Sequence, residues 1–306
     1  MRALTKTAER AWPAAMLRVE NRPPSPQQDH AFCGAISRLA VRSLYAELTL
    51  YPKPGLVSLV DNGSHDDMTA ATFMRSLFSL RHYFIRITRA GMDDAPFATL
   101  KRLGIEAEQR MLLATRGINT HRGAIFCIGM LCAAIGYCQA QRITLSVAAI
   151  RAVLLMRWGD ALAAHMQSAA PGSHGLQAAA QHAASGAREE MALGLPSVFE
   201  VALPALRQTL AAGRDWDHAR IDALFSLMAH ISDTNVYHRG GELGATTVRL
   251  RARSFLALGG TAHPDWQDHA LDSHRIFTEQ RLSPGGAADL LAAACLVHEV
   301  TRKPFL

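Results

Sequence analysis

The 306-residue sequence has few cysteines and no pair of them at a metal-binding spacing. Its five cysteines are Cys33, Cys127, Cys132, Cys138 and Cys295, and no Cys-x-x-Cys occurs among them. An odd number excludes a complete disulfide framework, and the lack of Cys-x-x-Cys argues against a structural zinc site. Three of the five lie in one apolar stretch, where free thiols behave as small hydrophobic residues. We therefore expect a reduced protein in the cytoplasm.

The sequence also lacks segments that would direct it to a membrane or to nucleic acid. Glu9 and Arg10 interrupt any apolar core of a signal peptide, and no stretch is expected to reach the apolar length that spans a bilayer. The net charge is +6, yet Lys and Arg form no block and no stripe interleaved with aromatic residues. We expect neither a membrane nor a nucleic-acid partner, and the dispersed positive charge favours small phosphorylated substrates.

Residues that favour β-strands are sparse, whereas Ala and Leu dominate. Apolar residues recur at helical spacing, and no strand-like alternation occurs. The sequence therefore predicts an all-α fold, a single large multi-helix domain of about ten to twelve helices with no substantial sheet. The expected helices cover 29–50, 69–90, 96–115, 124–137, 145–165, 197–212, 217–231, a segment from 243, 266–280 and 287–300.

The first 28 residues are predicted to form a flexible N-terminal extension. The segment Arg22-Pro23-Pro24-Ser25-Pro26 cannot continue a helix and is typical of a linker. Residues 29–306 then make up the helical catalytic domain.

A polar segment, Gly117 to Arg122, precedes the most apolar stretch of the chain. Asn119 and Thr120 are good N-cap residues, and His121 and Arg122 add hydrogen-bond donors. A helix start offers unpaired N–H groups and the positive end of a dipole, which suit a phosphate. The alternative is an ordinary capped helix start with His and Arg in water.

A second polar segment, Asp61 to Met68, places potential metal ligands close together. Asp66 and Asp67 are carboxylates of the kind that magnesium prefers, and Ser64 and His65 stand beside them. The alternative is a turn followed by a helix start, in which Ser64 and the two aspartates are caps and dipole partners.

Further polar segments follow the same pattern at the ends of expected helices. They contain Glu108; Arg188 and Glu190; Asp233, Asn235 and Arg239; and Ser283, Gly285 and Gly286. Ser283 followed by Pro284 is a plain helix-start signal, whereas the two glycines after it suggest close approach of a ligand or of backbone. We expect these segments to gather around one site.

Taken together, these segments resemble the triphosphoribosyl-dephospho-coenzyme A synthase family. The resemblance rests on Pro52 to Val57, Gly63 to Met68, Gly117 to Phe126, Gly186 to Arg188, Asp233 to Val236, Arg239 to Gly241 and Ser283 to Leu291, in that order over roughly residues 29–300. The form of Val57 to His65 is most like the malonate decarboxylase branch. The citrate lyase branch commonly has Asp where Ser58 stands here, Arg122 replaces a frequent Lys, and Ala192 occupies a place that is often acidic.

The resemblance implies a helical enzyme that joins ATP to 3′-dephospho-coenzyme A and releases adenine. Its product would be the prosthetic-group precursor of an acyl carrier subunit, passed on to a phosphoribosyl-dephospho-coenzyme A transferase. A homodimer is one option for its assembly. The reaction is a glycosyl transfer with a transition state like an oxocarbenium ion.

The resemblance also gives the polar residues expected roles. Lys53, Arg122 and Arg239 would hold the triphosphate, with Mg²⁺ on Asp66, Asp67 or Asp233; Glu108, Glu190 or an aspartate would be the general base; and His65 or His121 would assist the leaving adenine. The remaining substrate-binding candidates are Ser64, Asn119, Thr120, Arg188, Asn235, Ser283, Gly285 and Gly286.

Two other classes of protein could explain parts of this pattern. A helical metal-dependent phosphohydrolase would use the same Asp and His residues on a nucleotide or phosphorylated metabolite, and it would release phosphate rather than adenine. A helical nucleic-acid-binding module would account for the positive charge and would bind DNA or RNA with strong salt dependence. It would not account for the scattered Asp, Asn and Gly residues.

Overall fold

The computed structural model describes residues 25–167 and 187–302, and the elements in these ranges are all helices. They are α1 (Pro26–Thr49), α2 (Ala70–Ser79), α3 (Arg81–Met92), α4 (Phe97–Thr115), α5 (Arg122–Ala140), α6 (Val147–Gln167), α8 (Ala187–Ala192), a π-helix (Ser197–Ala202), α9 (Leu203–Ala211), α10 (Trp216–His230), α11 (Thr234–Ala257), a 3-10 turn (Gly260–Ala262), α12 (Trp266–Glu279) and α13 (Gly285–Thr301). The all-α prediction is confirmed.

Helix boundaries differ from the predicted ones where a local cap or a distant contact intervenes. Helix α1 begins at Pro26 rather than Asp29, because Ser25 and Gln28 form a reciprocal capping box and Pro suits the first helical position. The single helix predicted for 69–90 is two helices that meet at Leu80. There the Ser37 hydroxyl of α1 donates to the carbonyl of Arg81 at 2.7 Å.

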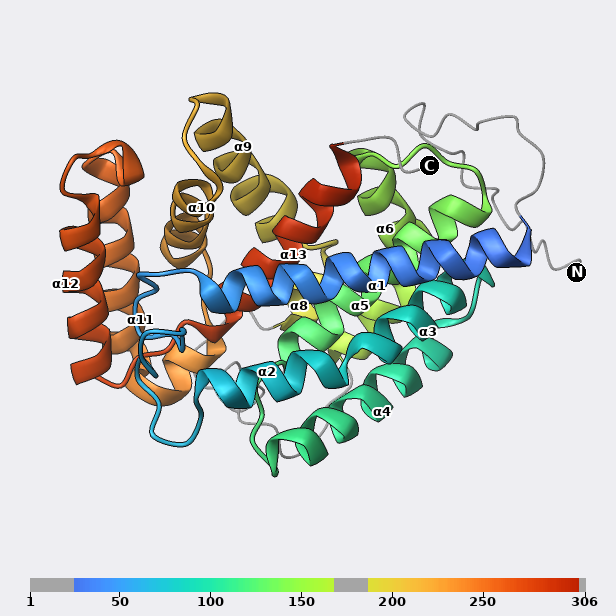
Figure 1. Ribbon diagram of the computed structural model, residues 1–306, viewed down its shortest axis with the longest axis horizontal. Coiled ribbons are helices and arrows are strands. Elements are labelled where there is room, and N and C mark those ends of the chain that lie inside the picture. Colours follow the sequence, from blue (N-terminus) through green and yellow to red (C-terminus); the bar gives the residue numbers. More distant parts are fainter. Residues whose placement is uncertain (1–24, 168–186, 303–306) are drawn as a thin grey trace, which may run out of the picture.

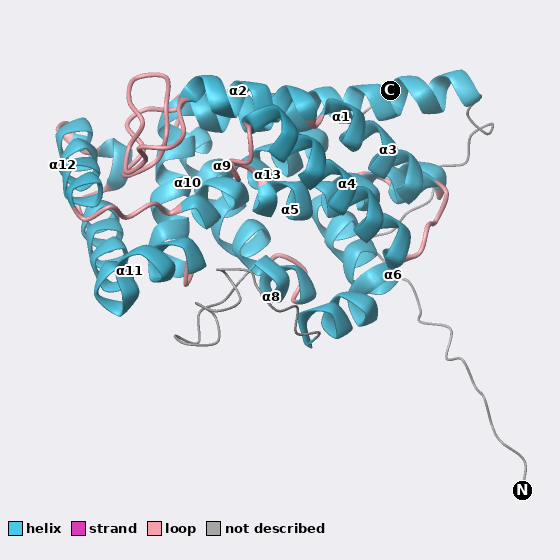
Figure 2. Ribbon diagram, turned by 90° about the horizontal axis from the view of Figure 1, so that it is seen from below, coloured by secondary structure: helices cyan, strands magenta, loops and turns pink. Residues whose placement is uncertain are grey.

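Helix α5 is the central element of the fold. Almost every residue from Ala124 to Cys138 is buried, and α5 packs against α3, α13, α6 and α4. Helix α13 is nearly as buried and also packs against α1, which runs along the long axis of the molecule in Figure 1. Helices α11 and α12 lie side by side at one end (Figures 1 and 2). The starts of α11 and α5 both contact the first turns of α13.

Among the described residues, only α5 is long and apolar enough to cross a membrane by length and composition. This corrects the expectation that no stretch reaches that length. However, 78% of its most apolar window is buried inside the protein. The hydropathy of α5 is therefore that of a core helix, which is apolar on all sides because other helices surround it.

Glycines allow α3 and α5 to pack with their backbones almost in contact. A Cβ atom at Gly91 would lie 2.0 Å from the Ala133 carbonyl oxygen, and one at Gly136 would lie 2.1 Å from the Thr88 carbonyl oxygen. Since these neighbours are backbone atoms, neither helix can make room by changing a rotamer. The α3–α5 pair therefore depends on residues without a side chain.

This packing predicts that Gly136→Ala lowers the free energy of unfolding by about 1–3 kcal/mol or more, because the added methyl forces α3 and α5 apart. Gly104→Ala on α4 is the matched control. Its nearest neighbour is 3.8 Å away, so better helix propensity should raise stability by about 0.5–1 kcal/mol. Chemical denaturation of both variants measures the effect, and equal stabilities would contradict the proposed packing.

Candidate functional site

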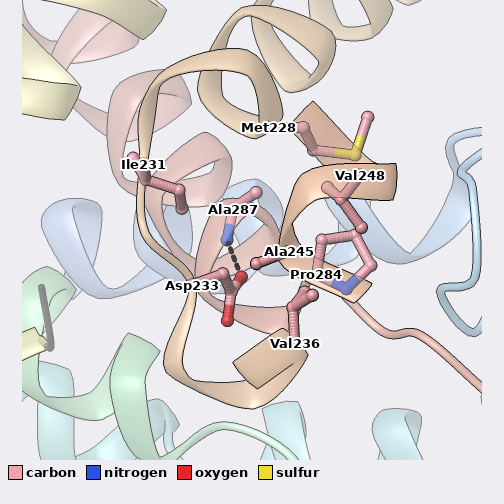
Figure 3. A pocket seen from close by; sticks show the side chains of 8 residues that line it. All are labelled: Met228, Ile231, Asp233, Val236, Ala245, Val248, Pro284 and Ala287. Carbon is pink, nitrogen blue, oxygen red and sulfur yellow. Dashed lines mark hydrogen bonds between the residues drawn. The ribbon is translucent and has the colours of Figure 1, made fainter. Parts of the chain in front are cut away.

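Asp233 joins the starts of α11 and α13. One carboxylate oxygen accepts the backbone N–H of Asn235 at 2.9 Å, and the other accepts that of Ala287 at 3.1 Å (Figure 3). Burial raises the pKa of Asp233, and these backbone N–H groups oppose the rise. Helix α13 is thus capped by a residue that precedes it by more than fifty positions, and not by Ser283 as the sequence pattern predicted.

Asp289, one turn into α13, lies against the start of α5. A Cβ atom at Gly123 would stand 2.1 Å from the Asp289 Oδ2 atom, so the carboxylate lies directly against the first turn of α5. Burial raises the pKa of Asp289 well above its usual range, and the nearby carboxylates of Glu47 and Asp233 raise it further. Gly123 is therefore needed because the carboxylate occupies the place of a side chain.

The side chain of Asn119 accepts a backbone N–H at the start of α5. Its Oδ1 atom accepts the backbone N–H of Arg122 at 3.2 Å. Asn119 thus engages one of the N–H groups that were expected to face a phosphate, and the Asp289 carboxylate lies beside the same turn.

His65 is held between the segments that contain Arg239 and Ser283. The Arg239 guanidinium donates to Nδ1 of His65 at 3.0 Å, and Nε2 of His65 stands 2.8 Å from the Ser283 hydroxyl. Since a guanidinium can only donate, Nδ1 is the acceptor and Nε2 carries the proton. Burial lowers the pKa of His65, and the charge of Arg239 lowers it further. This histidine is therefore neutral and fixed in one tautomer.

The segment around His65 is folded tightly onto the end of α12. The Ser64 hydroxyl stands 2.6 Å from the carbonyl oxygen of Leu282 and 3.1 Å from that of Phe277. Gly55 adopts a positive φ of 69°, and a Cβ atom there would lie 2.1 Å from the Leu282 carbonyl oxygen. Ser64, predicted to bind substrate, thus contacts backbone in this structure and positions His65 beside Arg239.

A second buried histidine is oriented by two hydroxyl groups. Thr120 donates to the Ser76 Oγ atom at 2.7 Å, and Ser76 lies 2.6 Å from Nδ1 of His121. These hydrogen bonds orient the ring through Nδ1 and leave Nε2 as its second polar atom. That Nε2 atom is buried and has no hydrogen-bond partner among the described residues. Burial lowers the pKa of His121 to about 3, with Lys53 as a second cause.

Lys53 is an interior residue. It is 1% exposed, and its Nζ atom pairs with the Glu47 carboxylate at 2.5 Å. Burial lowers the pKa of Lys53, and Glu47 opposes that shift. Removing one member of such a pair leaves an uncompensated buried charge. The predicted contact of Lys53 with the triphosphate stays a prediction, and its observed partner is Glu47.

Two more of the predicted site carboxylates have protein partners. Glu108 accepts from Arg122 Nε at 2.6 Å, and Arg122 Nη2 is also within ion-pair distance. Glu190 accepts the Ser197 hydroxyl at 2.5 Å and the Ser197 backbone N–H at 3.2 Å. The side chain of Arg188 lies outside the described residues. Of these groups, the Arg122 guanidinium is the one with broad access to solvent, since its side chain is 48% exposed.

The carboxylates predicted for magnesium do not form one preassembled group. Asp66 and Asp67 are exposed beside His65, whereas Asp233 gives both oxygens to helix starts. Within residues 25–167 and 187–302, no group of three or more His, Cys, Asp or Glu side chains is placed to hold a metal ion. Magnesium is commonly held by one or two carboxylates together with substrate phosphates, and Asp66 and Asp67 fit that mode.

The remaining predicted residues line the junction of α11 and α13. Asn235 is exposed, and its amide lies 3.0 Å from where a Cβ atom of Gly285 would stand. A Cβ atom at Gly286 would be 2.9 Å from Asp233. A small pocket opens here, lined by apolar residues around Asp233 (Figure 3). The glycines thus allow close approach of protein groups.

Sequence reasoning assigned no role to Glu47, Ser76 or Asp289, although each contacts or neighbours a predicted site residue. A signal was available for two of them. Glu47 precedes Leu48 in a buried stretch of α1, and Asp289 interrupts the run Ala287-Ala288-Asp289-Leu290-Leu291. A carboxylate inside an apolar helix needs a partner or a function. Ser76 carries no comparable signal, because serine is common on helix surfaces.

Comparison with known proteins agrees with the resemblance noted in the sequence. A family model described as ATP:dephospho-CoA triphosphoribosyl transferase matches residues 33–304. A protein from Acinetobacter calcoaceticus named "Probable 2-(5''-triphosphoribosyl)-3'-dephosphocoenzyme-A synthase" is 39% identical over 281 residues, 90% of this chain and 96% of the relative. A relative of the same name from Vibrio cholerae is 36% identical over 279 residues, 87% of this chain and 88% of the relative.

A further relative, from Pectobacterium atrosepticum, is named "2-(5''-triphosphoribosyl)-3'-dephosphocoenzyme-A synthase". It is 39% identical over 276 residues, 86% of this chain and 88% of the relative. No solved structure matches the chain. The matches favour a transferase over the phosphohydrolase and nucleic-acid-binding alternatives.

The burial of His121 predicts a pH dependence of stability. Its pKa is about 3 in the folded protein and about 6.5 in an unfolded chain, so between these values only the unfolded chain binds the proton. The stabilising effect is complete above about pH 6.5 and is lost as the pH falls toward 3. His121→Gln, which does not titrate, should reduce the slope of unfolding free energy against pH by up to about 1.4 kcal/mol per pH unit. Denaturant unfolding from pH 7 to pH 4 measures it, and parallel slopes for both proteins would contradict this burial.

Proposed function

Because the chain belongs to the ATP:dephospho-CoA triphosphoribosyl transferase family, we propose that it joins the triphosphoribosyl part of ATP to 3′-dephospho-coenzyme A and releases adenine. The family makes the chain a transferase. The observation that carries the proposal is the match over residues 33–304. The convergence of the polar segments on the starts of α5 and α13 supports it, since those segments also carry the sequence resemblance.

The reaction needs a site that binds a triphosphate and tolerates positive charge on the ribose. Exposed guanidinium groups suit the phosphates, because they give several donors in a fixed plane. Arg122 at the start of α5 and Arg239 beside His65 are the exposed candidates. Asp66 and Asp67 would hold magnesium together with the phosphates, and the ion would neutralise phosphate charge when bound.

We place the reaction in the cytoplasm. The five cysteines are free and buried, which is compatible with a reducing compartment. We also propose that the product serves a malonate decarboxylase acyl carrier subunit, after a phosphoribosyl-dephospho-coenzyme A transferase has used it. The form of Val57 to His65 supports this branch.

The proposed reaction predicts that adenine release requires ATP, magnesium and dephospho-coenzyme A together. Arg122→Ala should raise the KM for ATP by about tenfold or more, whereas Arg122→Lys should retain much of the binding, since a point charge still attracts a phosphate. Arg110→Ala is the matched control, because Arg110 is an exposed arginine of α4 outside the polar segments.

Adenine release, KM and thermal stability should be measured on the same preparations. If the start of α5 is only a capped helix start with no ligand, Arg122→Ala should lower the free energy of unfolding by about 1 kcal/mol and leave the kinetics normal. Unchanged KM in all three variants would overturn the role of Arg122. Absence of adenine release from the unmodified protein would overturn the proposed reaction.

The malonate branch predicts a specific growth defect. Deleting the gene should abolish growth on malonate as carbon source and leave growth on citrate intact, because only one acyl carrier then lacks its prosthetic group. Restoring the gene should restore growth. A defect on citrate alone would assign the protein to the other branch.

A further inference from the structure

The proposed reaction needs a proton for the departing adenine, and neither predicted histidine is placed to supply one. His65 accepts from Arg239 at Nδ1, and its Nε2–H faces the Ser283 hydroxyl. His121 is 2% exposed, and its Nδ1 is occupied by Ser76. Burial lowers the pKa of both imidazoles, so both are neutral and neither is an acid that releases a proton at neutral pH.

Most carboxylates near the site are already engaged. The engaged groups are Glu47 with Lys53, Glu108 with Arg122, Glu190 with Ser197, and Asp233 with the starts of α11 and α13. The oxygens of these carboxylates therefore already accept hydrogen bonds from groups of the protein. Asp66 and Asp67 are exposed, so water solvates them.

Asp289 differs from these groups in its contacts and its access. Among the described residues, no side-chain hydrogen bond reaches its carboxylate, and the Ala124 backbone N–H lowers its pKa. It is partly exposed, whereas Glu47 and Asp233 are buried. The missing side chain of Gly123 leaves room for the carboxyl group, since a Cβ atom there would stand 2.1 Å from Oδ2. Asp289 therefore lies between the packed interior and the solvent, directly against the start of α5.

A second observation marks the same helix start as a place for a ligand. His121 immediately precedes α5, and its Nε2 atom is buried without a hydrogen-bond partner among the described residues. A buried polar nitrogen without a partner is costly unless a ligand completes it. Adenine carries ring-nitrogen acceptors and an amino donor, so it offers a partner for this atom in either tautomer.

We propose that Asp289 is the general acid that gives its proton to adenine as the base leaves ATP, a role that rests on the proposed function. The groups around it favour its protonated form. Glu47 from α1 and Asp233 from the start of α11 bring negative charge, and the Cys127 thiol of α5 adds none while protonated. Burial raises the pKa of Asp289 well above its usual range, and the Ala124 N–H only partly opposes this.

The proton balance of the step is closed. The bond between C1′ of the ribose and N9 of adenine breaks, its electron pair stays with adenine, and the Asp289 proton moves to a ring nitrogen. The bond between the dephospho-coenzyme A hydroxyl oxygen and C1′ forms, and the hydroxyl proton passes to water. Solvent then returns a proton to the Asp289 carboxylate, so the enzyme is unchanged after each turnover.

An ATP analogue methylated at N7 of adenine tests this role. Its base is already a cation and leaves as a neutral molecule, so it needs no acid. Asp289→Asn should lower kcat with ATP by about 10²–10⁴-fold, the range for a general acid, and should lower kcat with N7-methyl-ATP by less than about tenfold. Asp268→Asn, on the exposed face of α12, is the matched control and should not distinguish the substrates.

The comparison remains valid if Asp289→Asn weakens the fold, because both substrates are tested on one preparation and the ratio of the two rates is read. An equal loss with both substrates would overturn the acid role while leaving the proposed function intact. A loss that higher magnesium restores would assign the carboxylate to the metal and also overturn it. If the unmodified protein released adenine from neither nucleotide, the proposed function itself would fail.

Discussion

Two aspartates hold three helix starts together, and the arrangement of the site depends on them. Asp233 accepts backbone N–H groups of α11 and α13, and the Asp289 carboxylate of α13 lies directly against Gly123 in the first turn of α5. The N–H groups of the first turn have no partner within their own helix, so burying them requires acceptors from elsewhere. A carboxylate suits this position because the helix dipole stabilises its charge. The arrangement of α11, α13 and α5 therefore depends on these polar contacts as well as on apolar packing.

This arrangement changes how the protein can bind a triphosphate. The start of α5 receives Asn119 and Asp289, and the start of α13 receives Asp233, so these helix ends hold protein groups where the sequence suggested phosphates. We therefore propose that phosphate binding falls to side chains at the edge, where Arg122 and Arg239 are exposed. Gly123 and Gly286 have no side chain, which lets the carboxylates of Asp289 and Asp233 lie close to the backbone at these helix starts.

The sequence predicted what is encoded locally. Helical periodicity gave the all-α fold, and the polar segments marked the helix starts that meet in the structure. Features that depend on distant residues could not be read. The cap of α13 is Asp233 rather than Ser283. The break between α2 and α3 at Leu80 contains no Pro or Gly that would have predicted it. Ser76 orients His121 from another helix. These contacts depend on how helices far apart in the chain pack together. The periodicity of a single segment carries no information about that packing.

The charges around the start of α13 also bear on the chemistry. Glu47, Asp233 and Asp289 approach one another from three helix segments, and Lys53, paired with Glu47, is the buried cation among them. The neighbouring histidines carry no compensating charge, because their partners and burial keep them neutral. Such an interior is stable when one carboxyl group keeps its proton or when a positive charge develops beside it. A glycosyl transfer produces that charge on the ribose in its transition state, so an excess of carboxylates would favour the transition state over the bound nucleotide.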